Sequence, residues 1–212
     1  MSLERAVRTA LRPLVRLVRG SSAWLLHPSR RQSTRAAITA MPPIRRILFI
    51  CHGNICRSPY AAAWFRRRLE ETGTRGLTIE SAGFVGGGRS SPTIALEVAR
   101  QRGIDMTRHV SQVATIAHWQ RADLVVVMEP AQKRSLEALH GRTGRTVIVL
   151  GDLDPNPVFS RSIPDPIEKP AAVFEAGYRR IERCVDALVA LCSVDLRMPP
   201  RPVSHTPWPR ST

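Results

Sequence analysis

The 212-residue sequence is poor in aromatic side chains, cysteines and acidic residues, and it has no long apolar run. Aromatic residues make up only 5% of the chain and do not alternate with basic residues as on surfaces that stack on nucleic-acid bases, so we expect no nucleic-acid partner. Four cysteines are too few for a dense disulfide framework, and cysteines and histidines do not cluster at zinc-ligand spacing. These shortages predict a reducing, cytoplasmic setting and a chemistry without metal or cofactor.

The shortage of acids leaves a formal net charge of +15, which is unevenly distributed. A basic N-terminal extension, residues 1–43, carries eight arginines against one acid. Between Leu3 and Val18, apolar residues recur at helical spacing with arginines among them, which predicts a short amphipathic segment. The later apolar stretch Trp24–Leu26 is too short to cross a bilayer.

Three interpretations of residues 1–40 remain open. The segment could be an organelle transit peptide, a helix in weak contact with a membrane surface, or upstream sequence read through before a start at Met41. Because Met41 stands directly before the first predicted strand, we favour a dispensable or misassigned leader.

The rest of the chain is organised around the stretch Cys51–Pro59, which reads Cys-His-Gly-Asn-Ile-Cys-Arg-Ser-Pro. It follows an apolar, β-branched run that ends at Ile50 and precedes a run suited to a helix. A loop that enters a helix points backbone N–H groups at one spot and adds the positive end of the helix dipole, so it can bind an oxyanion. Gly53 and Asn54 are residue types that tolerate the left-handed turns of such a loop.

Two side chains give this loop a chemistry beyond anion binding. The field of the loop favours the thiolate form of Cys51, which is a nucleophile. The planar guanidinium of Arg57 can hold two phosphate oxygens at once. A small buried cysteine before a Gly-Asn turn is the alternative, but the strand–loop–helix context disfavours it. The other predicted phosphate-site residues of the loop are His52, Gly53, Asn54, Ile55, Cys56 and Ser58.

From Ile44 onward, strand-like apolar runs alternate with amphipathic helical runs, which predicts a three-layer α/β/α fold around a four-stranded parallel sheet. The ligand of such a sheet lies beyond the carboxyl ends of its strands, where the Cys51 loop is expected. The predicted catalytic domain covers residues 44–193, and residues 194–212 are predicted to be a Pro-rich, disordered tail. The predicted strands are Arg46–Ile50, Leu77–Ser81, Ala122–Met128 and Thr146–Leu150. The predicted helices are Pro59–Thr72, Ser91–Arg102, Val113–Arg121, Ala131–His140 and Ala171–Leu191.

Release of an alcohol or phenol from a phosphate ester requires a proton donor, and a carboxyl group is a common one. Two Asp-Pro pairs qualify. Asp165 opens the loop before the last predicted helix and is one candidate for the acid. Asp154 is predicted to be a solvated turn residue.

Several short motifs recur in the order found in the low-molecular-weight protein tyrosine phosphatases, and the chain resembles this family over about residues 44–192. The motifs are Cys51–Pro59, Ser81-Ala-Gly83, Gly103-Ile-Asp105 with His109, Ala122–Met128 and Ile163-Pro-Asp-Pro166. The resemblance implies a phosphatase I-like fold and hydrolysis of phosphotyrosine in proteins through a cysteinyl-phosphate. It assigns Cys51 as nucleophile, Arg57 as phosphate clamp and Asp165 as general acid and base.

The resemblance also implies roles around the nucleophile. Ser58 would hydrogen-bond the sulfur of Cys51, while Asn54, Ser81 and His109 would hold the loop. His109 considered alone is equally well a surface histidine. Cys56 corresponds to a second loop cysteine that can pair with the nucleophile under oxidation, although packing under the loop explains it equally well.

Substrate choice stays open at this point. Isoleucine at position 55 favours phosphotyrosine, because the arginine-phosphate hydrolases of the family carry threonine there. The aromatic residues that commonly wall the family's cleft are poorly represented around Phe84–Gly88 and at Ile167. The alternatives are therefore another small phosphate ester, phosphoarginine, or a non-catalytic module that binds phosphoproteins or membranes.

Overall fold

The computed structural model describes residues 23–141 and 145–196. The predicted amphipathic pattern between Leu3 and Val18 and residues 197–212 of the predicted tail lie outside the described residues. None of the helices in the described ranges combines the length and apolarity that a bilayer crossing requires.

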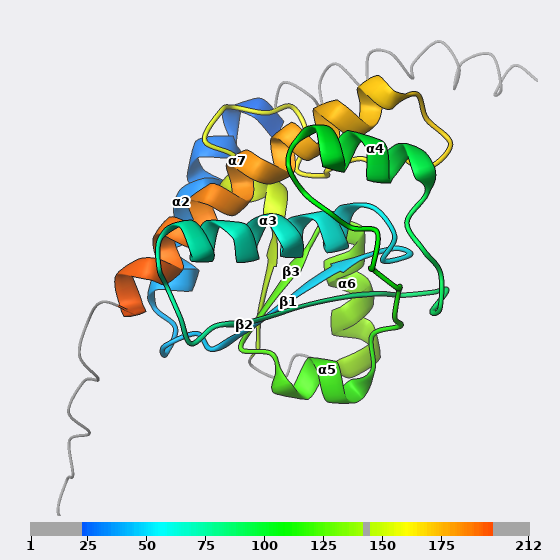
Figure 1. The fold of residues 1–212 in the computed structure, drawn as a ribbon. Coiled ribbons are helices and arrows are strands. Elements are labelled where there is room, and N and C mark those ends of the chain that lie inside the picture. The colour runs from blue at the N-terminus through cyan, green and yellow to red at the C-terminus, as the bar shows by residue number, and fades with distance from the viewer. Residues whose placement is uncertain (1–22, 142–144, 197–212) are drawn as a thin grey trace, which may run out of the picture.

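Four strands form one parallel sheet, as predicted, and their order is β2-β1-β3-β4 (Figure 1). The central strands are almost completely buried because helices cover both faces of the sheet, which explains their continuous apolar runs. The register places Cys51 beside Gly83 and Ile50 beside Val127, so three carboxyl ends meet at one edge. The strands are β1 (Arg46–Cys51), β2 (Thr78–Gly83), β3 (Leu124–Val127) and β4 (Thr146–Val149).

Helices on both faces complete the predicted three-layer α/β/α arrangement (Figure 1). One face packs around Phe49, Phe65 and Tyr178, and the other around Val125 and Trp119. The first face carries α2 (His27–Thr39), α3 (Arg57–Glu71), α4 (Thr93–Gln101), the 3-10 helix η1 (Leu150–Leu153) and α7 (Ala171–Leu196). The second face carries α5 (Ile116–Arg121) and α6 (Pro130–His140).

The predicted helices are all present, with shifted ends. Helix α3 begins at Arg57, two residues before the predicted start, and Pro59 lies in its first turn, where proline costs no hydrogen bond. Helix α7 continues to Leu196 and so takes up the first residues of the predicted tail.

Helix α2 lies in the segment that we expected to be a leader, yet it packs on the domain. It contacts η1 and α7, and Ile38 joins the core of the first face with 2% of its surface exposed. His27 is buried as well, and its Nε2 lies 2.9 Å from the backbone oxygen of Asp154. In Figure 1, α2 lies beside α7 on the same side of the sheet.

The prediction that Asp154 is a solvated turn residue was wrong. Asp154 is completely buried, and its carboxylate accepts hydrogen bonds from Arg180 and Arg183 on α7. A buried carboxylate is tolerated when cations and donors compensate its lost hydration. Both arginines lie more than 25 residues further along the chain, so the local turn pattern could not reveal them.

Candidate active site

The loop between β1 and α3 turns sharply at the carboxyl edge of the sheet. Asn54 adopts a left-handed conformation with φ of 51°, as predicted. Gly53 does not have a positive φ, so the expectation of a left-handed turn there was wrong. Glycine at position 53 leaves room for Arg89 instead, since a Cβ atom would lie 2.8 Å from Nη2 of Arg89 and the guanidinium would have to shift.

A buried hydrogen-bond network centred on Asn54 holds this turn. Its amide nitrogen donates to Ser58 Oγ at 2.9 Å and to Ser81 Oγ at 3.0 Å. Its side-chain oxygen accepts from the backbone N–H of Gln112 at 3.0 Å, and His109 Nε2 lies 2.7 Å from its backbone oxygen. The structure therefore brings Asn54, Ser58, Ser81 and His109 together.

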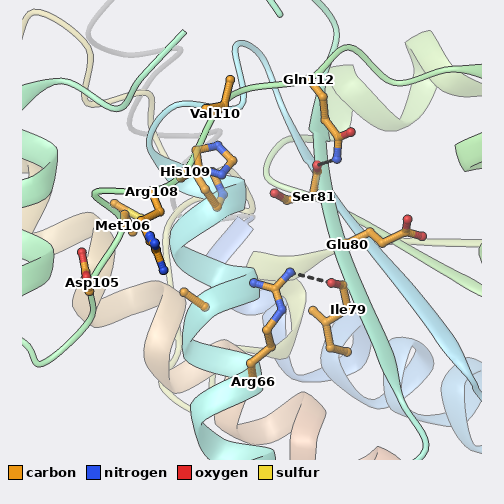
Figure 2. A pocket seen from close by; sticks show the side chains of 12 residues that line it. Arg66, Ile79, Glu80, Ser81, Asp105, Met106, Arg108, His109, Val110 and Gln112 are labelled. Atoms are coloured by element: carbon orange, nitrogen blue, oxygen red, sulfur yellow. Dashed lines mark hydrogen bonds between the residues drawn. The ribbon is translucent and has the colours of Figure 1, made fainter. Parts of the chain in front are cut away.

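Gln112 is a network residue that the sequence did not indicate. Besides the bond from its backbone, its side-chain amide donates to the backbone oxygen of Ser81 at 2.8 Å. Figure 2 shows Ser81, His109 and Gln112 around a cavity of about 320 Å³ between α3 and β2. A glutamine in a loop gives no local signal of such a contact.

The sulfur of Cys51 lies at the end of β1 with 2% of the residue exposed. Ser58 Oγ donates a hydrogen bond to Cys51 Sγ at 3.0 Å, the contact that the resemblance implies. Cys51 lines a cavity of about 160 Å³ together with Arg57 and Asp165. Ile55 also lines this cavity, and His52 is exposed at its rim.

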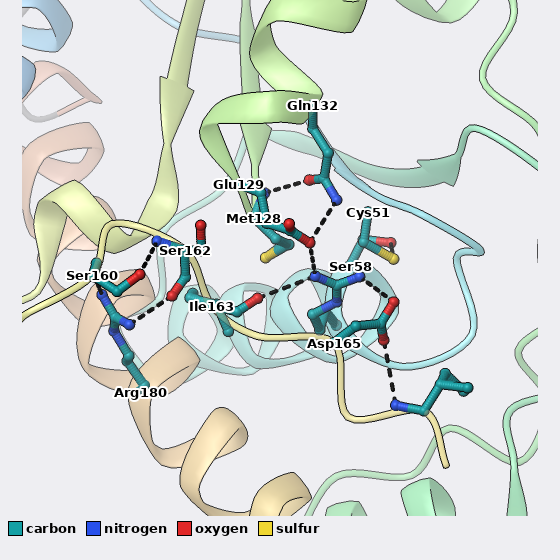
Figure 3. Close-up of polar contacts among 12 residues, drawn as sticks. Cys51, Ser58, Met128, Glu129, Gln132, Ser160, Ser162, Ile163, Asp165 and Arg180 are labelled. Atoms are coloured by element: carbon teal, nitrogen blue, oxygen red, sulfur yellow. Dashed lines mark hydrogen bonds and ion pairs between the residues drawn. The ribbon is translucent and has the colours of Figure 1, made fainter. Parts of the chain in front are cut away.

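Arg57 is 2% exposed and pairs with two carboxylates, those of Glu129 and Asp165, which Figure 3 labels. Its Nη1 donates to Glu129 Oε1 at 2.5 Å and to the backbone oxygen of Ile163 at 3.1 Å. Its Nη2 donates to Asp165 Oδ2 at 2.6 Å, while Nε has no acceptor among the described residues. The protein thus anchors Nη1 with Glu129 and Ile163, and a two-oxygen ligand on the Nε–Nη2 edge would share Nη2 with Asp165.

Glu129 is the second residue that sequence reasoning missed. It follows the end of β3, the strand next to β1, and Gln132 donates to the same Oε1 atom at 3.3 Å. Gln132 in turn accepts from the backbone N–H of Met128 at 2.9 Å. An acid directly after a strand that neighbours the strand of Cys51 was the available signal.

Asp165 belongs to a loop that α7 holds in place. Arg180 donates to the backbone oxygens of Ser160 at 2.6 Å and Ser162 at 2.8 Å (Figure 3). The backbone N–H of Ile163 bonds to Met128 at 2.9 Å, which ties the loop to the end of β3. The side chain of Asp165 is 40% exposed, so its carboxylate is open to solvent on one side.

Cys56 is buried beneath the loop with 2% of its surface exposed. Burial, and to a smaller extent the charges of Cys51 and Asp165, raises the pKa of its thiol from 9.0 to about 12. Cys56 therefore stays a neutral thiol at physiological pH, whereas a nucleophile must ionise.

The position and the groups of this site narrow the class of protein. A doubly wound sheet binds its ligand beyond the carboxyl ends of its strands, and there this chain presents a thiol, a buried guanidinium and a carboxyl group. Such groups suit an enzyme that hydrolyses phosphate esters through cysteine. No group of three or more metal-binding side chains occurs within residues 23–141 and 145–196.

Comparison with known proteins makes the identification specific. The family model described as low molecular weight phosphotyrosine protein phosphatase matches residues 46–197. A probable low molecular weight protein-tyrosine-phosphatase, EpsP of Ralstonia solanacearum, is 39% identical over 69% of this chain and 94% of its own length. The chain therefore belongs to the low-molecular-weight protein tyrosine phosphatase family, a family of cysteine-type hydrolases.

Two solved structures illustrate the range of similar proteins. The YwlE arginine phosphatase from Geobacillus stearothermophilus has a TM-score of 0.62 and 27% identity, over 71% of this chain and 94% of its own. The tyrosine phosphatase Wzb from Escherichia coli K30, solved with sulphate, has a TM-score of 0.61 and 27% identity, over 69% and 97%. The helix α2 lies before the residues that the family model matches.

Proposed function

We propose that the chain hydrolyses phosphotyrosine in proteins through a cysteinyl-phosphate intermediate. The observation that carries this proposal is that Asp165 lines one cavity of about 160 Å³ with Cys51 and Arg57, although Asp165 lies 108 positions after Arg57 in the chain. In this proposal the Cys51 thiolate attacks phosphorus, and the bond between phosphorus and the phenolic oxygen breaks. Asp165, in its acid form, gives its proton to that oxygen.

The second step regenerates the enzyme. Asp165, now a carboxylate, takes a proton from water while the water oxygen attacks phosphorus, and Cys51 leaves as a thiolate. The hydrogen bond from Ser58 Oγ stabilises that thiolate. In both steps the Nε–Nη2 edge of Arg57 and the loop N–H groups hold the non-bridging oxygens, which is the electrostatic work that phosphoryl transfer requires.

Phosphoarginine is a second candidate substrate because one of the similar solved structures is an arginine phosphatase. Ile55 supports phosphotyrosine, since it lines the cavity and has no atom that could hydrogen-bond a guanidinium. Another small phosphate ester is a further alternative substrate.

A substrate panel tests this proposal. Phosphate release from matched phosphotyrosine, phosphoarginine and phosphoserine peptides is measured in chelator, with wild type and Cys51→Ser. We expect phosphotyrosine to have the highest kcat/KM and Cys51→Ser to lose turnover while it still binds phosphate. Preferred hydrolysis of phosphoarginine would replace the substrate assignment, and wild-type turnover in Cys51→Ser would refute the mechanism.

We also propose that residues 44–193 form the catalytic domain, flanked by the extension 1–43 and the tail 194–212. The proposed location of the protein is a reducing cytoplasm. Exposed Trp24, Leu25 and Leu26 precede the basic helix α2, which supports weak contact with an anionic membrane surface. Pelleting with anionic vesicles, with and without residues 1–40, tests that contact, and equal pelleting would exclude it.

A further inference from the structure

A second arginine lines the proposed substrate cavity. Arg89 comes from the loop between β2 and α4, and it borders the same cavity as Cys51 and Arg57. Its backbone is fixed by Ser111, whose N–H donates to the Arg89 oxygen at 2.8 Å and whose Oγ accepts from the Arg89 N–H at 3.0 Å. The position of Arg89 is therefore set by the fold.

The guanidinium of Arg89 is held by backbone oxygens on both sides of the cavity rim. Its Nε donates to Gly86 at 2.8 Å, and its Nη2 donates to Gly53 at 3.2 Å and Val85 at 3.4 Å. Any side chain at Gly53 or Gly86 would collide with this guanidinium, and Gly86 has a φ of 72° that also favours glycine. The two glycines thus create the space that the guanidinium occupies.

The charge of Arg89 is uncompensated, unlike that of Arg57. Arg57 is paired with both Glu129 and Asp165, whereas Arg89 contacts no carboxylate within the described residues. Its Nη1 has no acceptor in the same part of the chain, so N–H donors remain for a ligand. Arg89 is exposed, so an anion can reach it without losing all of its hydration.

We propose that Arg89 binds a second anionic group of the substrate, the carboxylate of an acidic residue that flanks the phosphorylated residue. This inference rests on the proposed phosphatase function and names the substrate class as acidic phosphotyrosine peptides. The same positive charge repels the cationic guanidinium of phosphoarginine, which gives an electrostatic reason for the substrate order proposed above.

A ratio experiment isolates this contact. Two phosphotyrosine peptides differ only in aspartate or asparagine residues beside the phosphotyrosine, and kcat/KM is measured for both with wild type, Arg89→Gln and Arg89→Glu. The control is Arg100→Gln, which removes an exposed arginine of α4. Because each ratio is taken within one variant, a change in the loop that affects both peptides equally cancels.

We expect wild type and Arg100→Gln to prefer the acidic peptide by about two- to fivefold, as for an exposed ion pair. Arg89→Gln should bring the ratio to one, and Arg89→Glu should invert it. The preference should also disappear at about 1 M salt, where the Debye length is about 3 Å.

The outcomes separate the two proposals. Equal kcat/KM for both peptides in wild type, or a preference that survives in Arg89→Gln, would overturn the role of Arg89 and leave the phosphatase function intact. Hydrolysis of neither peptide by wild type would overturn both.

Discussion

At the scale of single residues, the carboxylate of Asp165 has two roles that conflict. It pairs with Arg57, and it is the proposed proton donor. Asp165 Oδ2 lies 2.6 Å from Nη2, on the edge of the guanidinium that a phosphate must use. In the proposed mechanism, a phosphate on this edge would compete with Asp165 for Nη2 of Arg57. We therefore expect this carboxylate both to supply the proton and to compete with the substrate for Arg57.

This competition leads to a prediction for Asp165→Asn. Turnover should fall by roughly 10²–10⁴-fold, because a general acid is lost. Inorganic phosphate should bind about fivefold more tightly, because removing a negative charge a few ångströms away is worth about 1 kcal/mol. Initial rates and phosphate inhibition constants measure the two effects.

Glu175→Gln is the matched control for this experiment, since Glu175 is an exposed carboxylate of α7 that pairs with Arg179 rather than with Arg57. Unchanged or weaker phosphate binding in Asp165→Asn would show that the carboxylate does not compete for Arg57.

Cys56 makes stability depend on pH on the alkaline side. Its pKa is raised from 9.0 to about 12 in the folded protein. Below pH 9 the thiol is protonated in both the folded and the unfolded chain, so it does not make the free energy of unfolding depend on pH there. Above pH 9 the unfolded chain releases the proton while the folded chain keeps it, and the free energy of unfolding falls by up to about 1.4 kcal/mol per pH unit.

Urea unfolding between about pH 8 and pH 11 tests this linkage. The slope of the unfolding free energy against pH should be smaller in Cys56→Ala than in wild type, whatever constant amount the substitution itself costs. The buried Cys184 thiol also has a raised pKa and adds a slope that both proteins share. Parallel curves would mean that Cys56 is not protected from ionisation.

At the scale of elements, the loop between β1 and α3 depends on a single left-handed residue. Asn54 has a φ of 51° and makes three side-chain hydrogen bonds in a buried position. Ser81 and the backbone of Gln112 would lose a buried partner without it. The loop therefore relies on Asn54 for both conformation and bonding.

We predict that Asn54→Ala lowers the free energy of unfolding by about 2–4 kcal/mol, from lost buried hydrogen bonds and left-handed strain. Asn54→Gly should lose the same bonds without the strain and remain about 1 kcal/mol more stable than Asn54→Ala. Urea denaturation of the three proteins gives both differences. Equal stability of the two variants would show that the conformation of residue 54 carries no cost.

The elements also show why some site residues were predictable and others were not. Cys51, Arg57 and Ser58 lie in one continuous strand–loop–helix segment, where each residue type has a local meaning. Glu129 and Gln112 reach the site from segments more than 50 residues away, and only Glu129, which follows a strand next to β1, had a signal in the sequence. Gly53 was correctly placed in the loop, but the predicted reason, a left-handed turn, was wrong. The glycine leaves space for Arg89, which is 36 positions further along the chain.

At the scale of the whole molecule, the sheet and its helices follow from the alternation of apolar runs, but the position of α2 does not. Few of its residues are buried, chiefly His27 and Ile38, so its sequence lacks the apolar stripe that predicts packing. The contact of α2 depends on the surfaces of η1 and α7, and the sequence of residues 1–43 gives no information on these surfaces.

Removal of residues 1–40 should therefore destabilise the protein by about 2–4 kcal/mol relative to removal of residues 1–22, because Ile38 and His27 lose their buried contacts. Full-length Ile38→Ala should lose a similar amount by leaving a cavity. Chemical denaturation of the three proteins measures the difference. Identical midpoints for the two shortened proteins would support the interpretation of the segment as a dispensable leader.

The ion pair between Asp165 and Arg57 also affects how inorganic anions compete for the site. Chloride and bicarbonate are abundant in cells, and each carries only one negative charge with which to dislodge Asp165 from the guanidinium. An ester with two negative charges gains roughly twice the Coulomb attraction and meets the loop N–H groups as well. We therefore expect common monovalent anions to displace Asp165 less readily than a dianionic ester does, so the enzyme should remain active in ordinary physiological salt.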